Sequence, residues 1–277
     1  MDKFMYEHLK NIEYLYGDDV YVQIPNSIFG DLSSNNSTNI QQVSFAYGYV
    51  TIVAFLYKYA HFVDIDYGTY IQNADIKQLL GYNRNTKTID YIIRKNGVLD
   101  TIGLTKTIKD YPIRFVQHPT EKINNVPIRE FMTINDIDES DINYSTIKSI
   151  VKNRNYTVKE PVFFFECDDD AGTLYNYANT HRVTLKELIA FIYSDNLDNV
   201  DFLLYCYFKS KCLGLPQNTK SIGLHIISRD LDIGADAFYK HLNKLKDRQY
   251  MSANHKGWVM GAVENGLDAN EYTFKGI

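Results

Sequence analysis

The segment SIGLHIISRDLDIGADAFYKHLNKLKDRQY, which covers Ser221–Tyr250, carries the strongest fold signal in the sequence. Its apolar residues recur with the 3.6-residue period of an amphipathic helix, over Ser221–Leu231 and again over Ala235–Asp247. Between them, Asp232-Ile233-Gly234 predicts a tight turn, because Asp and Gly accept the backbone conformations that turns need. Two helices joined by so short a turn cross steeply, which is typical of a helix-turn-helix unit.

The flanking segments extend this unit. The sequence VDFLLYCYFKSKCL, Val200–Leu213, is apolar almost all round and predicts a buried helix before the segment. After it, Gln249–Ser252 and Gly257–Gly261 predict two strands around a turn at Asn254–Lys256. Three helices followed by a hairpin are the order of a winged helix.

An earlier part of the chain repeats this order. It predicts a buried helix, a second helix capped by Asn73, a third helix after a short turn, and two strands, at Phe45–Phe62, Asn73–Gly81, Thr86–Asn96, Val98–Leu104 and Thr107–Phe115. Leu80 and Leu231 are equivalent positions, so the offset is 231 − 80 = 151 residues. Similarity at this offset favours a duplicated domain over a solenoid repeat.

The two copies are separated by an acidic connector. Residues 130–170 contain ten acidic and four basic side chains. We therefore expect an α+β protein that is mainly helical with small hairpins, and that consists of a first winged-helix domain at 1–118, a connector at 119–160 and a second winged-helix domain at 161–277. The other expected elements are a strand at Val20–Ile24, a linker helix at Tyr144–Asn153, a buried strand at Val162–Phe165 and a helix at Val183–Ser194 capped by Thr184.

Basic residues gather on the predicted third helices and hairpins. The chain has a formal net charge of −5, which opposes binding to a polyanion. Between Tyr82 and Phe115, however, seven basic residues face three acidic ones, and between Phe238 and Trp258 five face one. Local charge at a contact surface matters more than the total, so both regions are candidate DNA-contacting surfaces.

Helical geometry separates an inner from an outer face at both sites. At 100° per residue, Ile89, Ile92 and Ile93 line one side of the first third-helix, and Phe238, Leu242 and Leu245 line one side of the second. Arg84, Asn85, Lys87, Lys95, Lys240, Asn243 and Lys244 are then expected to read bases, while Lys106, Lys109, Arg248 and Lys256 hold phosphates. The full predicted interface adds Asn83, Thr86, Tyr91, Arg94, Arg114, Tyr239 and His255. A solvated amphipathic helix and a solvated hairpin tip are the alternative interpretations.

Signals for catalysis are missing from the sequence. It contains no Walker loop, no G-x-G-x-x-G, no G-x-S-x-G and no H-x-x-x-H pair, and its seven histidines are scattered. Cys167, Cys206 and Cys212 are expected to be reduced structural thiols. Asp168-Asp169-Asp170 is the one acidic run able to suggest a metal-dependent nuclease, and is more typical of a loop. We expect no enzyme activity, no cofactor and no metal.

The sequence also bears on cellular location. The longest apolar run has about eight residues, whereas a membrane helix needs roughly 20. The N-terminal residues MDKFMYEHLK lack the apolar core of a signal peptide. A cytoplasmic protein with no membrane partner is expected.

The first 115 residues resemble the theta-type plasmid replication initiators of low-GC Gram-positive bacteria. The resemblance rests on VQIPNSIF at Val22–Phe29, YGYVTIVAFL at Tyr47–Leu56, YIQNADIKQLLGYN at Tyr70–Asn83, and the third helix with its hairpin. It implies a winged helix that binds repeated origin DNA as a dimer, with Arg84, Lys87, Tyr91, Arg94 and Lys95 at recognition-helix positions.

Two hypotheses follow. The first is a double-stranded DNA-binding protein that acts as a plasmid or phage replication initiator or as a transcription regulator, as a homodimer and together with replication proteins. The second is a winged-helix module that binds a partner protein, such as a replisome component or a phage regulatory protein, without specific DNA binding. The sequence pI of about 5.8 favours the second.

Overall fold

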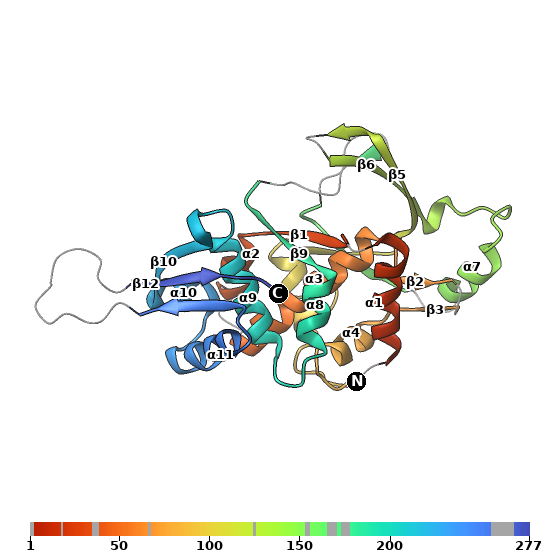
Figure 1. The fold of residues 1–277 in the computed structure, drawn as a ribbon. Helices are drawn as coiled ribbons and strands as arrows, with labels where there is room; N and C mark the ends of the chain where they lie inside the picture. Colours follow the sequence, from red (N-terminus) through yellow and green to blue (C-terminus); the bar gives the residue numbers. More distant parts are fainter. Residues whose placement is uncertain are drawn as a thin grey trace, which may run out of the picture. The chain divides into compact units, whose positions relative to one another are not determined.

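The computed structural model describes residues 3–17, 19–34, 39–65, 68–123, 126–152, 156–164, 171–172, 178–255 and 269–277. The chain divides into two units, residues 1–24 with 49–178 and residues 25–48 with 179–277, and we call these unit 1 and unit 2. Both mix helices and strands, as the α+β prediction requires (Figure 1). The limits of the units differ from the domain boundaries predicted from the sequence, because each unit combines two stretches of chain.

Unit 1 holds the N-terminal helix and most of the central residues. Its elements are α1 (Lys3–Tyr16), β1 (Tyr21–Pro25, which ends at the division), the second half of α3 (Ile40–Lys58), β2 (Val63–Asp64), β3 (Thr69–Tyr70), α4 (Asn73–Leu79), α5 (Asp90–Ile93), α6 (Val98–Thr101), β4 (Thr105–Ile108), β5 (Pro112–Ile123), β6 (Val126–Thr133), the 3-10 helix η1 (Ile134–Asp136), α7 (Tyr144–Lys152), β7 (Val158–Pro161) and β8 (Ala171–Gly172). Antiparallel pairs join β2 to β3, β4 to β7, and β6 to both β5 and β8.

The predicted third helix and hairpin of the first copy are not formed as expected. The helix is shorter than predicted and consists only of α5. It ends there because Arg94 takes an extended conformation, and the chain turns so that Gly97 lies close to the carbonyl oxygens of α5. A Cβ at Gly97 would lie 2.4 Å from the Tyr91 carbonyl oxygen, so only glycine fits there. The predicted strand Val98–Leu104 is wrong, since α6 begins directly after Gly97. β4 pairs with β7 rather than with its neighbour β5.

Other expectations in unit 1 have mixed outcomes. The linker helix is present as α7, and Gly81 ends the second helix region with φ +81°. The cap of α4 is Gln72 instead of Asn73, because Gln72 and Asp75 form a reciprocal capping box. The predicted strand Val162–Phe165 is wrong over its described part, where Val162–Phe164 forms a turn and a bend after β7; Phe165 lies outside the described residues.

Unit 2 holds the C-terminal elements. They are α2 (Ile28–Ser33), the first half of α3, β9 (Thr180–Thr184), α8 (Leu185–Ile192), α9 (Asn199–Cys212), the 3-10 helix η2 (Pro216–Asn218), β10 (Thr219–Gly223), α10 (Leu224–Leu231), α11 (Ala235–Asp247), β11 (Met251–Asn254) and β12 (Ala269–Phe274). β12 lies between β10 and β11 in an antiparallel three-stranded sheet, which Figure 1 draws in blue. Residues 256–268, which join β11 to β12, lie outside the described part of the chain and include the predicted strand Gly257–Gly261.

The core of unit 2 is built around α9. Its residues are buried on every side of the helix, including Phe202, Tyr205, Tyr207 and Phe208. Tyr205 packs against Phe191 and Phe274, with ring centroids 5.0 Å from each. Full burial of a large apolar side chain contributes about 2 kcal/mol, so α9 supplies much of the stability of this unit.

One helix has the length and composition of a membrane span. α3 is 19 residues long and strongly apolar, but most of it is buried inside the protein. Buried core helices share these properties, and α3 alone satisfies this test within the described ranges.

A buried histidine makes unit 2 sensitive to acid. The Tyr47 hydroxyl donates to His181 Nε2 at 2.7 Å, and His181 Nδ1–H donates to Asn26 Oδ1 at 2.9 Å. The ring also stacks on Phe29, with centroids 5.3 Å apart. Burial, with a smaller effect of Lys209, lowers the pKa of His181 to about 3. This imidazole is therefore neutral in the folded protein at neutral pH.

The free energy of unfolding should fall as the pH drops below about 6.5, where the unfolded chain protonates His181 and the folded chain does not. The loss of unfolding free energy that this residue causes reaches about 2 kcal/mol at pH 5, and it grows until the pH falls below the folded pKa. His181→Gln should lower the free energy of unfolding at pH 7. Between pH 7 and 5, however, this free energy should fall by about 2 kcal/mol less in the variant than in the parent. Urea unfolding at both pH values measures it, and an unchanged slope in the variant would contradict the assignment.

Candidate nucleic-acid interface

The best-formed candidate interface lies on α10, α11 and the following hairpin of unit 2. α10 ends at Leu231, its C-cap Asp232 takes the left-handed conformation with φ 52°, and Gly234 is the N-cap of α11. The predicted turn is therefore present, and α11 covers the predicted residues Ala235–Asp247. β10 precedes α10, where the sequence pattern predicted an earlier start of the helix at Ser221.

α11 presents a polar face to solvent. Phe238, Leu242 and Leu245 are fully buried, as the helical period predicted. Lys240 and Asn243 are exposed, and Tyr239 is half-buried with its ring 6.0 Å from that of His255. Lys240, Asn243 and Tyr239 form a short outward-facing set on one helix, close to His255, which directly follows β11.

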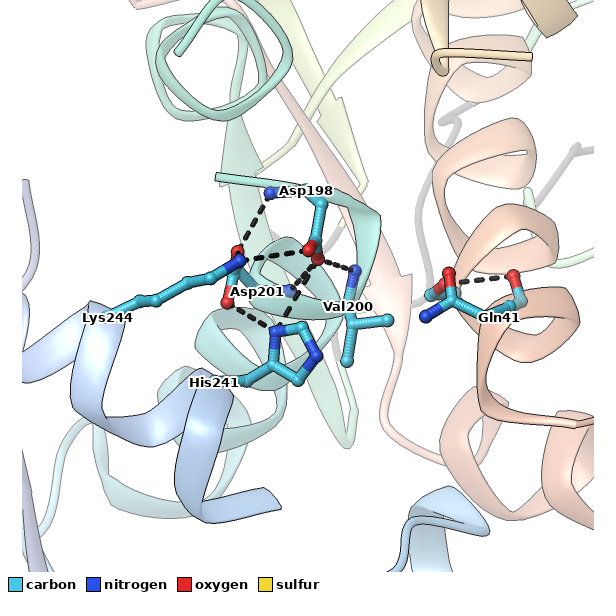
Figure 2. A network of polar contacts seen from close by, with 7 residues as sticks. Gln41, Asp198, Val200, Asp201, His241 and Lys244 are labelled. Carbon is cyan, nitrogen blue, oxygen red and sulfur yellow. Dashed lines mark hydrogen bonds and ion pairs between the residues drawn. The ribbon is translucent and has the colours of Figure 1, made fainter. Parts of the chain in front are cut away.

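Lys244 takes a different place from the one the sequence predicted. Its ammonium donates to Asp198 Oδ2 at 3.0 Å and to Asp201 Oδ2 at 2.8 Å, so it is tied to the start of α9 (Figure 2). His241 Nδ1 lies 2.7 Å from Asp201 Oδ1 in the same network. The ammonium of Lys244 is thereby occupied beneath the polar face, and it is less available to a ligand than that of Lys240.

The network is held together by burial and charge. Burial alone would lower the pKa of Lys244, but its hydrogen bonds to Asp201 and Asp198 outweigh this and raise it. Burial alone would raise the pKa of Asp198, and the hydrogen bond from Lys244 with the nearby His241 outweighs that and lowers it. Asp198 also caps α9 by accepting from the backbone N–H groups of Val200 and Asp201. Both shifts keep the two residues charged at neutral pH.

The same residues have the spacing of metal ligands. Ligand atoms of Asp198, Asp201 and His241 lie within 4.8 Å of one another. Both oxygens of Asp201 already accept hydrogen bonds, from His241 on one side and from Lys244 and the Asp198 N–H on the other. An ammonium group thus occupies the cationic position, so the cluster fits a helix cap with an ion pair better than a metal centre. The acidic run Asp168–Asp170 lies outside the described residues.

Unit 1 carries a second exposed basic region, in which two acidic residues form ion pairs with buried lysines. The buried Lys77 forms an ion pair with Asp90, and the buried Lys159 lies 2.5 Å from Asp100. Lys87, Arg94, Lys95, Lys106 and Lys109 are exposed, while Asp90 and Asp100 of the same region are paired with these buried lysines. Two bases of the region, Arg84 and Arg114, are paired in turn with Asp75 and Asp141, so the net charge of the region stays close to what its sequence composition indicates.

Two predicted arginines of unit 1 have carboxylate partners. Arg84 forms an ion pair with Asp75 and also lies 3.3 Å from Gln78 Oε1. Arg114 binds both oxygens of Asp141, at 2.5 and 3.2 Å. A DNA contact by either guanidinium would require it to share or leave its partner. Arg84 is thus a weaker candidate for base reading than the sequence predicted.

The remaining predicted residues are spread over the surface. Asn83 and Asn85 are exposed, Thr86 and Tyr91 are half-buried, and Arg248 is exposed with a hydrogen bond to Ser194 Oγ at 3.2 Å. Lys256 lies outside the described residues. Cys206 and Cys212 are free and buried, as predicted for structural thiols, and Cys167 is outside the described part.

Sequence reasoning missed the acidic partners of α11. Asp198 and Asp201 have the spacing of an N-cap and its N3 residue, which is a recognisable start signal for a helix. That signal predicts the cap, but not that the same carboxylates bind Lys244 more than 40 residues later.

The chain was also compared with known proteins. No protein-family model, no curated protein and no solved structure matches it.

Proposed function

We propose that the chain is a sequence-specific double-stranded DNA-binding protein, in which α9 to β12 of unit 2 form a winged helix. The observation that carries this proposal is the element order helix, strand, helix, turn, helix and hairpin, with β12 between β10 and β11 (Figure 1). The exposed polar residues of α11 support it. In helix-turn-helix proteins the second helix of the motif enters the major groove, and here that helix is α11.

The residues best placed for base contacts are Asn243 and Tyr239, and Lys240 is best placed for phosphate. An asparagine side chain can bind adenine through two hydrogen bonds. In unit 1, Lys87, Arg94 and Lys95 would add phosphate contacts, since their neighbouring acids are already paired. The sequence resemblance implies a role in plasmid replication and action as a homodimer. A phage initiator or a transcription regulator is the wider form of the same proposal, and a cytoplasmic location is the expectation from the hydropathy of the sequence.

Asn243→Ala and Lys240→Ala should have different effects on DNA binding. Asn243→Ala should cost roughly 1–3 kcal/mol on the selected site and relax the base preference at one position. Lys240→Ala should weaken selected and random duplexes alike and reduce the salt slope by about one. Selection from a random duplex pool followed by fluorescence anisotropy at several salt concentrations measures both.

Lys246→Ala is the matched control, because Lys246 lies on the same helix but outside the proposed contact set. It should change the salt slope less than Lys240→Ala does. Equal binding by the parent protein and both test variants across salt would contradict the proposed face.

The partner-protein alternative is favoured by the net charge of −5. It makes the opposite prediction for the same measurement: no selected sequence and no salt-dependent binding of duplex DNA.

A further inference from the structure

Unit 1 contains a cavity that the DNA-binding proposal does not use. It has a volume of about 600 Å³ and lies between the C-terminal end of α1, the residues after α3, β2, the start of β5 and the residue before α7. This volume is in the range of small-molecule sites. All of its lining residues belong to unit 1.

Aromatic rings form one side of this cavity. The ring of Tyr16 lies 5.1 Å from that of Tyr59, 5.2 Å from that of Phe115 and 6.2 Å from that of His61. Tyr16 keeps 41% of its surface exposed, and Tyr14, which also lines the cavity, keeps 88%. Exposed aromatic surface of this extent is unfavourable in water and indicates a face that a flat ligand can cover.

Hydrogen-bonding groups lie beside the rings. His61 Nδ1–H donates to the Tyr59 carbonyl at 2.9 Å, which makes His61 Nε2 the acceptor nitrogen of its ring. Burial lowers the pKa of His61 to about 4, in agreement with a neutral ring. Asn11 and Asn143 line the same cavity, and the side-chain amide of an asparagine offers both a donor and an acceptor.

Two residues of opposite charge, Arg114 and Asp64, also line the cavity, and Asp64 Oδ2 lies 3.4 Å from His8 Nδ1. Arg114 lies on the cavity wall and is held in place by both oxygens of Asp141. A guanidinium has five N–H donors, so a phosphate can bind Arg114 only by sharing it with Asp141. Stacked rings, amides and a fixed cation together match a base that carries a phosphate.

We propose that this cavity binds a nucleobase of a nucleotide, stacked on Tyr16 and hydrogen-bonded along its edge by the asparagine amides. Base stacking on aromatic side chains tolerates every base because each has a π face. The base could be supplied by a free nucleotide or by an unpaired position in single-stranded DNA. This site is independent of α11, so it stands or fails separately from the duplex-binding proposal.

Isothermal titration of the full chain with four probes tests the proposal: AMP, a short oligodeoxyadenylate, ribose 5-phosphate and indole. AMP or the oligonucleotide should bind, ribose 5-phosphate should not because it lacks the base, and indole should bind more weakly because it lacks the polar edge. Tighter binding of the oligonucleotide would identify single-stranded DNA as the source of the base, and tighter binding of AMP would identify the free nucleotide.

Tyr16→Ala should lower the affinity of the bound probe roughly tenfold, since it removes the stacking ring. Tyr16→Phe should keep it, which separates loss of stacking from loss of folding. Tyr14→Ala should also lower affinity, and its ring is too exposed to support the fold. Tyr6→Ala, which removes a half-buried tyrosine of α1 outside the cavity lining, is the control and should bind as the parent does. No binding of either base-containing probe, equal binding of all four probes, or unchanged affinity in Tyr16→Ala would overturn the proposal.

Discussion

Asp201→Ala is expected to lower the free energy of unfolding of unit 2 by about 3–5 kcal/mol, as is typical when one member of a buried ion-pair network is removed. Asp201 is fully buried, and its carboxylate accepts from Lys244, His241 and the backbone N–H of Asp198. Without it, the buried His241 loses its 2.7 Å partner and the start of α9 loses its reciprocal cap. Urea unfolding followed by circular dichroism measures the loss.

Asp195→Ala provides the matched control. Asp195 is exposed and precedes the same helix, so its removal should change stability by less than about 0.5 kcal/mol. An Asp201→Ala protein as stable as the Asp195→Ala protein would show that the network contributes little.

The Asp201 result also bears on how DNA-binding data should be interpreted. A loss of DNA binding in Lys244→Ala would have two explanations, a lost contact with DNA or a displaced α11, because Lys244 holds α11 to the start of α9. Lys240 is exposed on the same helix, so its substitution tests DNA contact without disturbing this network. The stability of each variant must therefore be measured beside its affinity.

The limits of α11 could be predicted from the sequence, whereas those of the equivalent helix in unit 1 could not. α11 has a regular apolar stripe, a preceding Asp-Ile-Gly turn and no internal break, so local signals agree. At Thr86–Asn96 the same apolar stripe is present, but the helix ends at Ile93, where the chain turns and brings Gly97 close to the Tyr91 carbonyl oxygen. This close approach of two backbone segments depends on packing, which the periodicity of apolar residues in the sequence does not describe.

Strand pairing was the least predictable part of the fold. β4 pairs with β7, where Thr105 faces Pro161, rather than with the strand that follows it. Neighbouring strands usually pair, so the local pattern favoured a hairpin. Lys159 on β7 donates to Asp100 and Thr107, and these long-range contacts help to hold the observed pair.

The candidate site shows the same division between local and distant causes. The helical period placed Lys240 and Asn243 on the exposed face and Phe238 in the core, and the structure agrees. The helical period placed Lys244 on the exposed face as well. In the structure, ion pairs with Asp198 and Asp201 instead draw its ammonium group toward the start of α9. Side-chain partners from distant parts of the chain are not visible in a one-dimensional pattern.

Lys209→Met is the second substitution with a large expected effect, again about 3–5 kcal/mol of unfolding free energy. The Lys209 ammonium lies 2.6 and 2.8 Å from the two carboxylate oxygens of Glu187, and both residues are buried. Burial alone would raise the pKa of Glu187, but the charge and hydrogen bond of Lys209 outweigh it and lower the pKa. Methionine fills a similar volume, so the main loss is the charge that stabilises the carboxylate.

The double variant Lys209→Met with Glu187→Gln separates this charge effect from packing. The carbonyl oxygen of glutamine can still accept from the Thr184 N–H and cap α8, while its NH2 group can donate to Tyr205 Oη, which lies 2.6 Å from Glu187 Oε1. Glutamine carries no charge, so most of the stability lost in the single variant should return. If the double variant is as unstable as Lys209→Met alone, the loss comes from the lysine stem.

The pH dependence gives an independent check on the same pair. Because the folded pKa of Glu187 is depressed, its stabilising contribution is present above the unfolded value of about 4.3 and disappears as the pH falls through the folded value. In Lys209→Met the burial effect is no longer opposed by the ammonium, so the carboxyl group should take up a proton at a higher pH than in the parent. The stability difference between parent and single variant should therefore begin to shrink at the pH where the carboxyl group of the variant takes up its proton, and continue to shrink down to the depressed folded pKa of the parent, whereas a packing defect would keep it constant.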